Sequence, residues 1–432
     1  MDEHEGSQGK TTPAPEHREG LGRRDLLGAG SAALVTAMLA AQGARGQSIQ
    51  NIAKAEHDVS SSDPGPENVA VRNVETNPFM PPDTDHSITP QFWNSFSAAH
   101  RRVEQGGWSR QVTIKDFPIS KEIAGVNMRL TAGGIRELHW HDAAEWALML
   151  DGKARITAID NNGKSFVNDV GVNDLWFFPT GTPHSIQGLG PNGCEFLLVF
   201  DDGAFSEEDT TLLTDWTRHV PREVLAKNWS VPESAVAPVY QVPETGYFIF
   251  QRPIPGPLQD DIRAAAGSKG SSPLSFSFQM GSMKPTYQTT GGEVKVVDSR
   301  NFPVATTIAA AYVVVHPGGL RELHWHQNAD EWQYYVAGKG RMTAFFNAAK
   351  ANTFDFNAGD VGYVPRTFPH YIENTGNTDL IFLEMFKAPK FEDLSLSEWV
   401  RNTPPELVID HLGISMATLQ RIPKNKTPVV PA

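Results

Sequence analysis

Short apolar stretches separated by turn residues run along most of the chain. In residues 112–145 and 294–331, apolar and polar positions alternate as they do in strands, because successive side chains of a strand point to opposite faces. The stretches are rich in Val, Ile, Phe and Thr, and Gly, Pro, Asn and Asp interrupt them. Such short strands are typical of sandwiches and barrels, not of βαβ units. The pattern therefore predicts an all-β fold.

The two stretches are copies of each other. Each contains a Gly-Gly turn followed by Arg-Glu-Leu-His-Trp-His, and the copies lie about 185 residues apart. A repeat of this length is too long for a solenoid and indicates a duplicated domain. The 432 residues, 40% of them hydrophobic, suffice for two separate cores.

Each copy carries three histidines and one glutamate at metal-ligand spacing. The two sets are His139, His141, Glu145 and His184, and His324, His326, Glu331 and His370. Residues two apart on a strand share a face, so both histidines of each His-x-His pair can point inward. Three imidazoles and a carboxylate suit divalent Mn, Fe, Ni or Zn and leave two positions of an octahedron open. A lone His-x-His pair could be two satisfied polar residues, but the repetition in register argues against this alternative.

The tryptophans between the paired histidines, Trp140 and Trp325, point to the opposite face by the same alternation. We expect them to pack between barrels or between subunits.

The repeated pattern resembles the two cupin motifs, and the duplicated chain resembles a bicupin oxalate decarboxylase. The first motif is complete in both copies, over residues 133–152 and 318–338. The second motif departs from the consensus at Asn173, Gly188 and Thr367, none of which is a ligand. The resemblance covers roughly residues 75–420 and implies two cupin barrels, which are double-stranded β-helices or jelly rolls, with short peripheral helices.

The resemblance also implies an activity, manganese-dependent decarboxylation of oxalate to formate and CO2 with dioxygen as a redox co-catalyst. It implies two Mn²⁺ ions per chain and a homo-oligomer, either a trimer or a hexamer. Zinc does not fit this chemistry because it has no redox step. Three alternatives stay open: an oxalate oxidase that yields CO2 and H2O2, a non-catalytic storage-type bicupin, and a non-haem dioxygenase or isomerase acting on another small acid.

The copies differ after their last barrel strand, where the first copy has three more residues, over 206–216 as against 392–399. Ser206 is a candidate helix N-cap with Asp209 at N3. In the family this lid supplies a glutamate as proton donor, and the matching position is Glu207. Glu208 and Asp209 replace the family's Asn and Ser, and the residues alone favour a simple acidic helix start.

Arg136 and Arg321 each precede the first histidine of a set by three residues. On a regular strand this odd offset turns them away from the ligands, and a twist or bulge after Gly133 and Gly134 would be needed to re-aim Arg136. The resemblance places these arginines at the substrate, and a guanidinium suits a dicarboxylate because it binds two oxygens at once. The alternative is a surface arginine on a strand.

Glu384 interrupts an apolar run at the position where the first copy has Leu198. A buried carboxylate is costly unless it is paired or functional. The resemblance places Glu384 near the second metal as a candidate catalytic residue, and the alternative is an ion pair with Arg321. The two interpretations are compatible.

Charge and cysteine content limit the possible partners. The net charge of −13 argues against a nucleic acid or an anionic membrane. The single cysteine, Cys194, excludes an intrachain disulfide and is expected to be a small buried apolar residue.

The chain begins with a predicted twin-arginine-type signal peptide, residues 1–46, in which Arg23 and Arg24 precede a run rich in Ala and Gly that is too short for a convincing membrane span. We therefore expect export to the periplasm or the outside; an uncleaved anchor is the alternative. The expected order continues with a flexible spacer (47–76), an N-terminal cupin domain (77–229), an interdomain linker (230–275), a C-terminal cupin domain (276–420) and a tail (421–432).

Overall fold

The computed structural model describes residues 65–66, 68–69, 90–346 and 350–432. The predicted signal peptide and most of the predicted spacer lie outside these residues. All the described residues belong to one compact unit. Among the described residues, no helix is long and apolar enough to cross a membrane.

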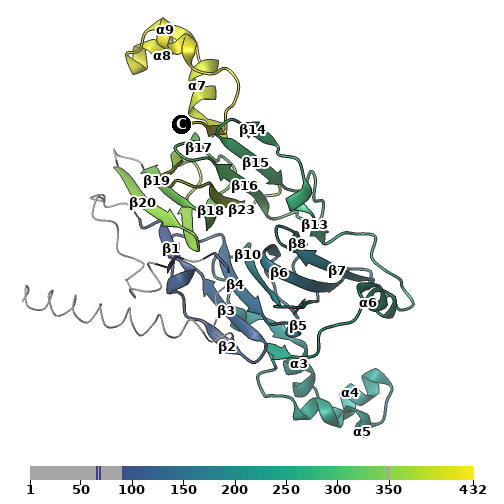
Figure 1. Ribbon diagram of the computed structural model, residues 1–432. Coiled ribbons are helices and arrows are strands. Elements are labelled where there is room, and N and C mark those ends of the chain that lie inside the picture. The colour runs from purple at the N-terminus through teal and green to yellow at the C-terminus, as the bar shows by residue number, and fades with distance from the viewer. Residues whose placement is uncertain (1–64, 67, 70–89, 347–349) are drawn as a thin grey trace, which may run out of the picture. The chain divides into compact units, whose positions relative to one another are not determined.

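The first half of the chain builds one antiparallel barrel (Figure 1), whose central strand order is β11-β5-β9-β6-β10-β4-β3-β2. Its strands are β2 (Arg102–Glu104), β3 (Gly107–Val112), β4 (Ala124–Leu130), β5 (Gly134–Trp140), β6 (Glu145–Ile159), β7 (Ser165–Gly171), β8 (Leu175–Phe178), β9 (His184–Gly188), β10 (Cys194–Phe200), β11 (Thr211–Leu212) and β12 (Ile249–Gln251). Inward-facing side chains of these strands form an apolar core that includes Met128, Ile156 and Phe196. Cys194 is buried in the same core, as expected.

The second half repeats this architecture in two sheets, with orders β1-β21-β18-β23-β16-β15-β14 and β20-β19-β22-β17-β24. Its strands are β14 (Tyr287–Thr289), β15 (Gly292–Val297), β16 (Ala309–Val315), β17 (Leu320–Trp325), β18 (Glu331–Ala337), β19 (Lys339–Phe346), β20 (Lys350–Asn357), β21 (Asp360–Val364), β22 (His370–Asn374), β23 (Leu380–Phe386), β24 (Leu394–Ser395) and β25 (Val429–Val430). The all-β prediction with two duplicated barrels is confirmed.

The two halves exchange strands. β1 (Trp93–Ser95) comes from the start of the first half but pairs with β21 of the second barrel. β13 (Ser277–Phe278) comes from the start of the second half and pairs with β8 of the first barrel. A buried apolar cluster also spans both halves and contains Trp146 and Trp332. The barrels therefore share part of their core.

Gly125 shows how closely the halves approach. A Cβ atom at this position on β4 would lie 2.6 Å from the ring of Trp332 on β18. Any larger residue would have to push the ring away, and the close packing of protein interiors makes such overpacking destabilising.

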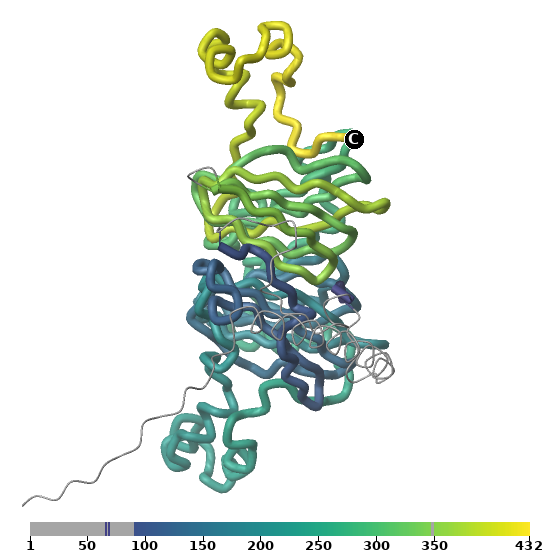
Figure 2. Tube along the Cα trace, turned by 90° about the vertical axis from the view of Figure 1, so that its left-hand side faces the viewer, coloured from purple at the N-terminus to yellow at the C-terminus, as the bar shows by residue number. Residues whose placement is uncertain are grey.

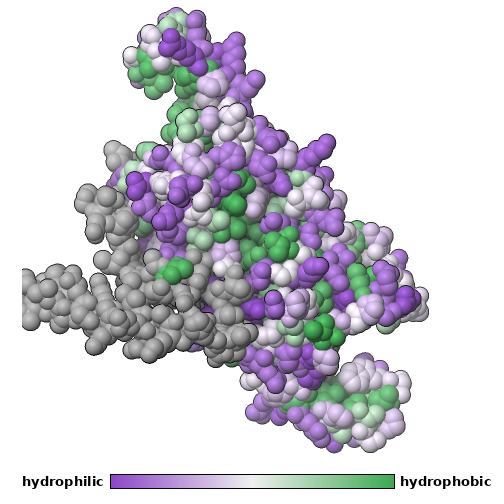
Figure 3. All heavy atoms as spheres, in the orientation of Figure 1, coloured by the Kyte–Doolittle hydropathy of each residue, from purple (hydrophilic) through white to green (hydrophobic). Residues whose placement is uncertain are grey.

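Helices leave both barrels as arms (Figures 1 and 2). The first arm contains α3 (Leu213–His219), α4 (Arg222–Trp229), α5 (Glu233–Val236) and η4 (Ala237–Gln241), and the second contains α7 (Leu396–Asn402), α8 (Pro405–Leu412) and α9 (Met416–Arg421). Apolar side chains are visible on the surface of both arms (Figure 3). The remaining short elements are η2 (Phe96–Ala98), η3 (Glu207–Asp209), α6 (Leu258–Ala265) and η5 (Met280–Ser282).

Trp140 and Trp325 pack against these arms. Trp140 meets Trp216 of α3 edge to face at 5.5 Å between ring centroids, and Trp325 meets Trp399 of α7 at 5.8 Å. Within the described chain the predicted packing between barrels is therefore wrong, because the arms fold back over this face of the strands. A contact between subunits stays a prediction.

The predicted linker, residues 230–275, is ordered. β12 adds to the first barrel through β5, and α6 lies against β7, where Arg155 binds Asp261 at 2.5 Å. The proline-rich composition indicated a connection but could not show that its backbone completes a sheet.

A short part of the predicted spacer is also described. The side-chain amide of Asn68 donates to both carboxylate oxygens of Asp360 at 2.8 Å. This segment departs from the predicted flexible spacer, because it finds a buried partner far along the chain.

Candidate metal centres and active site

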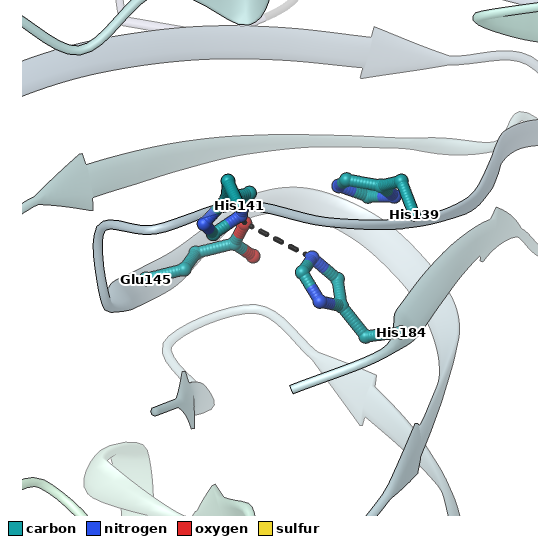
Figure 4. Close-up of side chains that lie close together, drawn as sticks. All are labelled: His139, His141, Glu145 and His184. Atoms are coloured by element: carbon teal, nitrogen blue, oxygen red, sulfur yellow. Dashed lines mark hydrogen bonds and ion pairs between the residues drawn. The ribbon is translucent and has the colours of Figure 1, made fainter. Parts of the chain in front are cut away.

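The first predicted ligand set comes together in the first barrel (Figure 4). His139 lies on β5 and His141 directly follows that strand, while Glu145 and His184 are the first residues of β6 and β9. All four are buried, and one ligand atom from each lies within 4.8 Å of the others. The register explains this, because His139 is the cross-strand partner of His184.

Backbone carbonyls orient each imidazole. The Nδ1 atoms of His139, His141 and His184 contact the carbonyl oxygens of Glu137, Ala143 and Thr182 at 2.6, 2.6 and 2.8 Å. A carbonyl oxygen only accepts, so each Nδ1 carries the proton and each Nε2 presents a lone pair to the centre. Burial and the nearby Arg136 lower the pKa of His139 well below its usual value, so this ring is neutral.

Glu145 completes the set. Its Oε2 lies 3.3 Å from Nε2 of both His141 and His184, and its Oε1 accepts a 2.8 Å hydrogen bond from the indole of Trp176. Burial raises the pKa of Glu145, but the histidines outweigh this and hold the pKa well below its usual range. Three neutral nitrogens and one carboxylate are the donor set that a divalent ion requires.

The second set repeats this geometry in the second barrel. His324, His326, Glu331 and His370 are buried, with one ligand atom from each within 4.8 Å of the others. Within the described chain, Nε2 of His324 is buried without a hydrogen-bond partner. Such an atom is costly unless a ligand satisfies it, so these residues also fit a metal ion.

The carboxylates differ in their supporting partners. Oε1 of Glu331 accepts from the amide of Gln333 at 2.7 Å, and Gln333 accepts from the hydroxyl of Tyr335 at 2.8 Å. In the first site the indole of Trp176 takes the place of the Gln333 amide and donates to Glu145.

A β-bulge re-aims the two arginines. In the pairing of β5 with β9, three residue steps from Arg136 to His139 oppose two steps from Ile186 to His184. The extra residue cancels the odd offset, so Arg136 and His139 share a face. The same irregularity separates Arg321 from His324 on β17. A bulge after the Gly-Gly turn is thus present, and it lies between the arginine and the first histidine.

Arg136 is buried beside the first centre without a carboxylate partner among the described residues. Its guanidinium lies 4.2 Å from the ring centroid of Phe248, and its Nη1 donates a long 3.4 Å hydrogen bond to the carbonyl of Phe248. Burial lowers the pKa of Arg136, while Glu207, Glu137 and Glu145 oppose that shift. Its positive charge is therefore available to an anion.

Arg321 is held in a different way at the second centre. Its Nε donates to Glu384 at 2.8 Å, and its Nη2 donates to Asp393 at 2.8 Å. Burial alone would lower the pKa of Arg321, but these two carboxylates outweigh burial and raise it. The predicted ion pair of Glu384 with Arg321 is confirmed, and Glu384 also acts electrostatically on His326 of the second set. Its catalytic role stays a prediction.

The lid forms a short 3-10 turn, η3, and its cap is as predicted. The Ser206 hydroxyl accepts from the backbone N–H of Glu208. Glu207 is partly buried and accepts a 2.5 Å hydrogen bond from Ser109 on β3. Burial raises the pKa of Glu207, against the opposing effects of Arg136 and Ser109. A carboxyl group of this kind holds a proton more readily than an exposed one.

Glu207 and Glu208 line two cavities, one of about 570 Å³ and one of about 290 Å³. Ser109 and Arg110 line the larger, and Phe248 lines the smaller. Arg102 lines both and binds Glu208 at 2.8 Å. The lid thus borders both cavities.

Comparison with known proteins agrees with this geometry. The cupin family model matches residues 94–237 and 278–420. Oxalate decarboxylase OxdC of Bacillus subtilis (strain 168) is 48% identical over 364 residues, which are 83% of this chain and 93% of the relative. The chain belongs to the bicupin oxalate decarboxylase family. A probable oxalate decarboxylase of Arthroderma benhamiae is 40% identical over 81% of this chain and 85% of its own length.

A solved structure of this family, from work on the Mn(II) centres of Bacillus subtilis oxalate decarboxylase, is 47% identical. It covers 81% of this chain and 91% of its own, with a TM-score of 0.77. Family membership and the two assembled ligand sets confirm the predictions of a bicupin enzyme and of two metal centres per chain.

Several residues around the two centres were not predicted from the sequence. Trp176 and Gln333 support the glutamate ligands, and Phe248 contacts Arg136. Trp176 and Phe248 come from distant elements, and no local pattern marks them, whereas Gln333 lies two residues after Glu331 on β18, where strand alternation places both side chains on one face. Asp393 was detectable, because it aligns with Glu207 when the copies are superposed on His184 and His370 without a gap.

Proposed function

We propose that the first centre converts oxalate to formate and CO2 and that Mn²⁺ is the resident ion at both centres. One observation carries the proposal: beside the first ligand set, buried Arg136 forms no ion pair with a carboxylate among the described residues, and Glu207, whose pKa is raised, lies in the lid. The corresponding arginine of the second set is neutralised by Glu384 and Asp393. An anionic substrate therefore has a counter-charge at the first centre only.

The eight predicted ligands would hold the two ions. Mn(II) centres in a relative that is 47% identical support manganese. When bound, the ion supplies open positions for carboxylate oxygens and a one-electron redox step in which we propose dioxygen as co-catalyst. Zinc lacks that redox step.

The residues of the chain bind the substrate and move its proton. Arg136 binds one carboxylate group of hydrogen oxalate through two parallel N–H···O bonds. Glu207 accepts the acidic proton of the other carboxyl group, the carbon–carbon bond breaks and CO2 leaves. Glu207 then returns the proton to carbon, which yields formate. Atoms and charge balance, since hydrogen oxalate becomes CO2 and formate.

The deciding experiment measures products. Mn-loaded protein is incubated with oxalate in the presence and absence of dioxygen, and formate and hydrogen peroxide are both measured. We expect formate and CO2 in equal amounts with traces of peroxide. Peroxide as the main product would identify an oxalate oxidase, and no product from protein with two bound ions would support the storage-type alternative.

Export and assembly remain proposals. We propose a homo-oligomer, either a trimer or a hexamer, supported by the exposed tryptophans on the arms, since Trp216 and Trp399 are 54% and 59% exposed. Light scattering of the purified protein tests this assembly. We also propose twin-arginine-dependent export, which replacement of Arg23 and Arg24 by Lys should block.

A further inference from the structure

Phe248 touches the guanidinium groups of two arginines. The guanidinium carbon of Arg136 lies 4.2 Å from the Phe248 ring centroid, and that of Arg102 lies 3.8 Å from it. Cations favour the face of an aromatic ring, most of all where water is excluded. Phe248 is buried, and so is Arg136. The ring therefore holds Arg136 without neutralising its charge or occupying its N–H donors.

The backbone of Phe248 is held in an unusual conformation to present this ring. Its φ is +57°, a region that bulky residues rarely enter. Its N–H donates to Glu137 Oε2 at 2.8 Å, and its carbonyl accepts from the Glu137 N–H at 3.1 Å. The next residue, Ile249, pairs with Arg136 in the β12–β5 ladder. Strain of this kind concentrates at functional sites, because the surroundings must enforce it.

The second barrel provides an internal comparison. There the carbonyl of Pro428 accepts from the Glu322 N–H at 3.1 Å, as that of Phe248 does from Glu137, and Val429 pairs with Arg321. Pro428 thus occupies the place of Phe248 and offers no aromatic face. Arg321 is held by two carboxylates instead.

The ring is also linked to the lid. Arg102, besides contacting Phe248, donates to Glu208 at 2.8 Å and to Glu104 at 2.9 Å. Glu208 directly follows Glu207 in η3. A chain of contacts therefore runs from the lid through Arg102 and Phe248 to Arg136.

We propose that Phe248 is a positioning residue that holds Arg136 ready for the carboxylate of oxalate, and that Arg102 couples this ring to the lid through Glu208. The inference rests on the proposed function, in which Arg136 binds oxalate. Phe248 acts through Arg136 and does not itself touch the reacting atoms.

The main test is Phe248→Leu, which keeps an apolar side chain but removes the aromatic face. Oxalate affinity of the Mn-loaded protein, measured by calorimetry without dioxygen, should fall about tenfold. The KM should rise by a similar factor with kcat changed less, since ground-state binding is lost. Metal content should stay at the wild-type value, and Phe248→Tyr, which keeps the ring, should restore the affinity.

Phe250→Leu is the matched control. Phe250 lies two residues further along, and its ring also carries an arginine, Arg252, at 4.9 Å. This variant should bind oxalate like the wild type. Equal affinities of the Phe248→Leu and Phe250→Leu proteins would overturn the proposal. If Phe248→Leu does not fold, Phe248→Met repeats the test with a flexible side chain of similar bulk.

A double-variant cycle tests whether the effect passes through Arg136. In an Arg136→Lys background, Phe248→Leu should cause no further loss of oxalate affinity, because the guanidinium that the ring positions is gone. The same tenfold loss in both backgrounds would mean a general structural role and would contradict the proposal.

The link to the lid predicts a smaller effect, because the ion pair is exposed. Glu208→Gln and Arg102→Gln should each raise KM about two- to threefold, and the double variant should be no worse than the single ones. If the increases in KM of the two single variants added up in the double variant, Arg102 would not couple the lid to Phe248. Failure of the proposed function can be told apart from failure of this inference. A wild-type protein that makes no formate contradicts the proposed function, whereas the calorimetric comparison of oxalate binding still tests the role of Phe248.

Discussion

The two barrels hold the same four ligands but treat the neighbouring arginine in opposite ways. Arg321 is locked between Glu384 and Asp393, whereas Arg136 rests on the ring of Phe248 and keeps its charge. The duplicated sites have thus diverged in the residues around the ligands while the ligands stayed the same. Both barrels hold a complete ligand set, and only the first keeps an arginine without a carboxylate partner among the described residues for the anionic substrate that we propose.

The lid shows the same divergence. Glu207 and Asp393 align without a gap, yet Asp393 binds Arg321 and Lys426 at 2.8 and 2.9 Å, and Glu207 binds the uncharged Ser109. The three extra residues follow Glu207. A carboxyl group without an ion pair can take up and release a proton, whereas a paired one is held ionised.

The residue that donates to the ligand glutamate comes from a different strand in each barrel. In both barrels a small residue faces this large donor on the neighbouring strand. In the first barrel Ala147 lies opposite Trp176, and in the second Gln333 lies opposite Gly362. Each pair supplies one N–H donor to the ligand glutamate. A Cβ on Gly362 would lie 2.7 Å from the Gln333 amide oxygen, so the two solutions exclude each other within one barrel.

Removal of ligands gives the largest expected effect. His139→Ala with His141→Ala should abolish formate production and lower the metal content from about two ions to about one, because a carboxylate and one imidazole bind a divalent ion weakly. The matched pair, His324→Ala with His326→Ala, should keep the metal of the first barrel. Metal analysis and formate assays check both. Unchanged metal content in the first variant would contradict the assignment of its ligands.

Glu207→Gln should lower kcat for formate about a thousandfold at unchanged metal content, because carbon protonation needs an acid in the lid. Residual turnover should shift towards peroxide, since an unprotonated intermediate survives long enough to meet dioxygen. Glu384→Gln is the comparison in the second barrel. If Glu384→Gln abolished formate and Glu207→Gln were nearly silent, the active site would move to the second barrel.

Leu198→Glu should place a carboxylate beside Arg136, as Glu384 lies beside Arg321 in the second barrel. Leu198 occupies on β10 the position that Glu384 occupies on β23, opposite Ala147 and Gln333 respectively. A carboxylate there would neutralise Arg136, and the KM for oxalate should rise about a hundredfold. Leu198→Gln, with a similar shape and no charge, is the control. Equal KM values for the two variants would show that neutralisation is not what separates the barrels.

The smallest expected effect is a pH dependence of the free energy of unfolding, caused by the buried carboxyl group of Asp360 on β21 of the second barrel. Burial raises the pKa of Asp360 to about 6, against hydrogen bonds from Asn357, Asn68 and Trp93. An unfolded aspartate titrates near 4, so the unfolded chain ionises first and stability falls as pH rises from about 4 to about 6. The loss is of the order of 2 kcal/mol.

Asp360→Asn should remove this fall, as measured by urea unfolding at pH 4 and pH 7. Asp174 is the matched position on the first barrel, where it accepts from the Gly171 N–H at 2.8 Å as Asp360 does from Asn357. Asp174→Asn serves as the control. A fall of equal size in wild type and Asp360→Asn would assign the dependence to other groups.

The alternation of polar and apolar residues was enough to predict the strands and the duplication, because burial of one face imposes a period of two. The ligand sets followed from spacing for the same reason. His139 and His141 lie close in sequence, and the turn before Glu145 is short, so local geometry already brings three ligands together. Even the cap at Ser206 is a local feature and was correctly predicted.

The tertiary structure alone decided how the arginines are used. A bulge between Arg136 and His139 reversed the face that strict alternation assigns, and cross-strand pairing with β9 creates that bulge. Phe248 reaches Arg136 from a segment that composition marked as a linker, and β1 and β13 cross to the opposite barrel. These contacts join residues more than a hundred positions apart, and their free energy comes from packing and pairing that no local window of sequence contains.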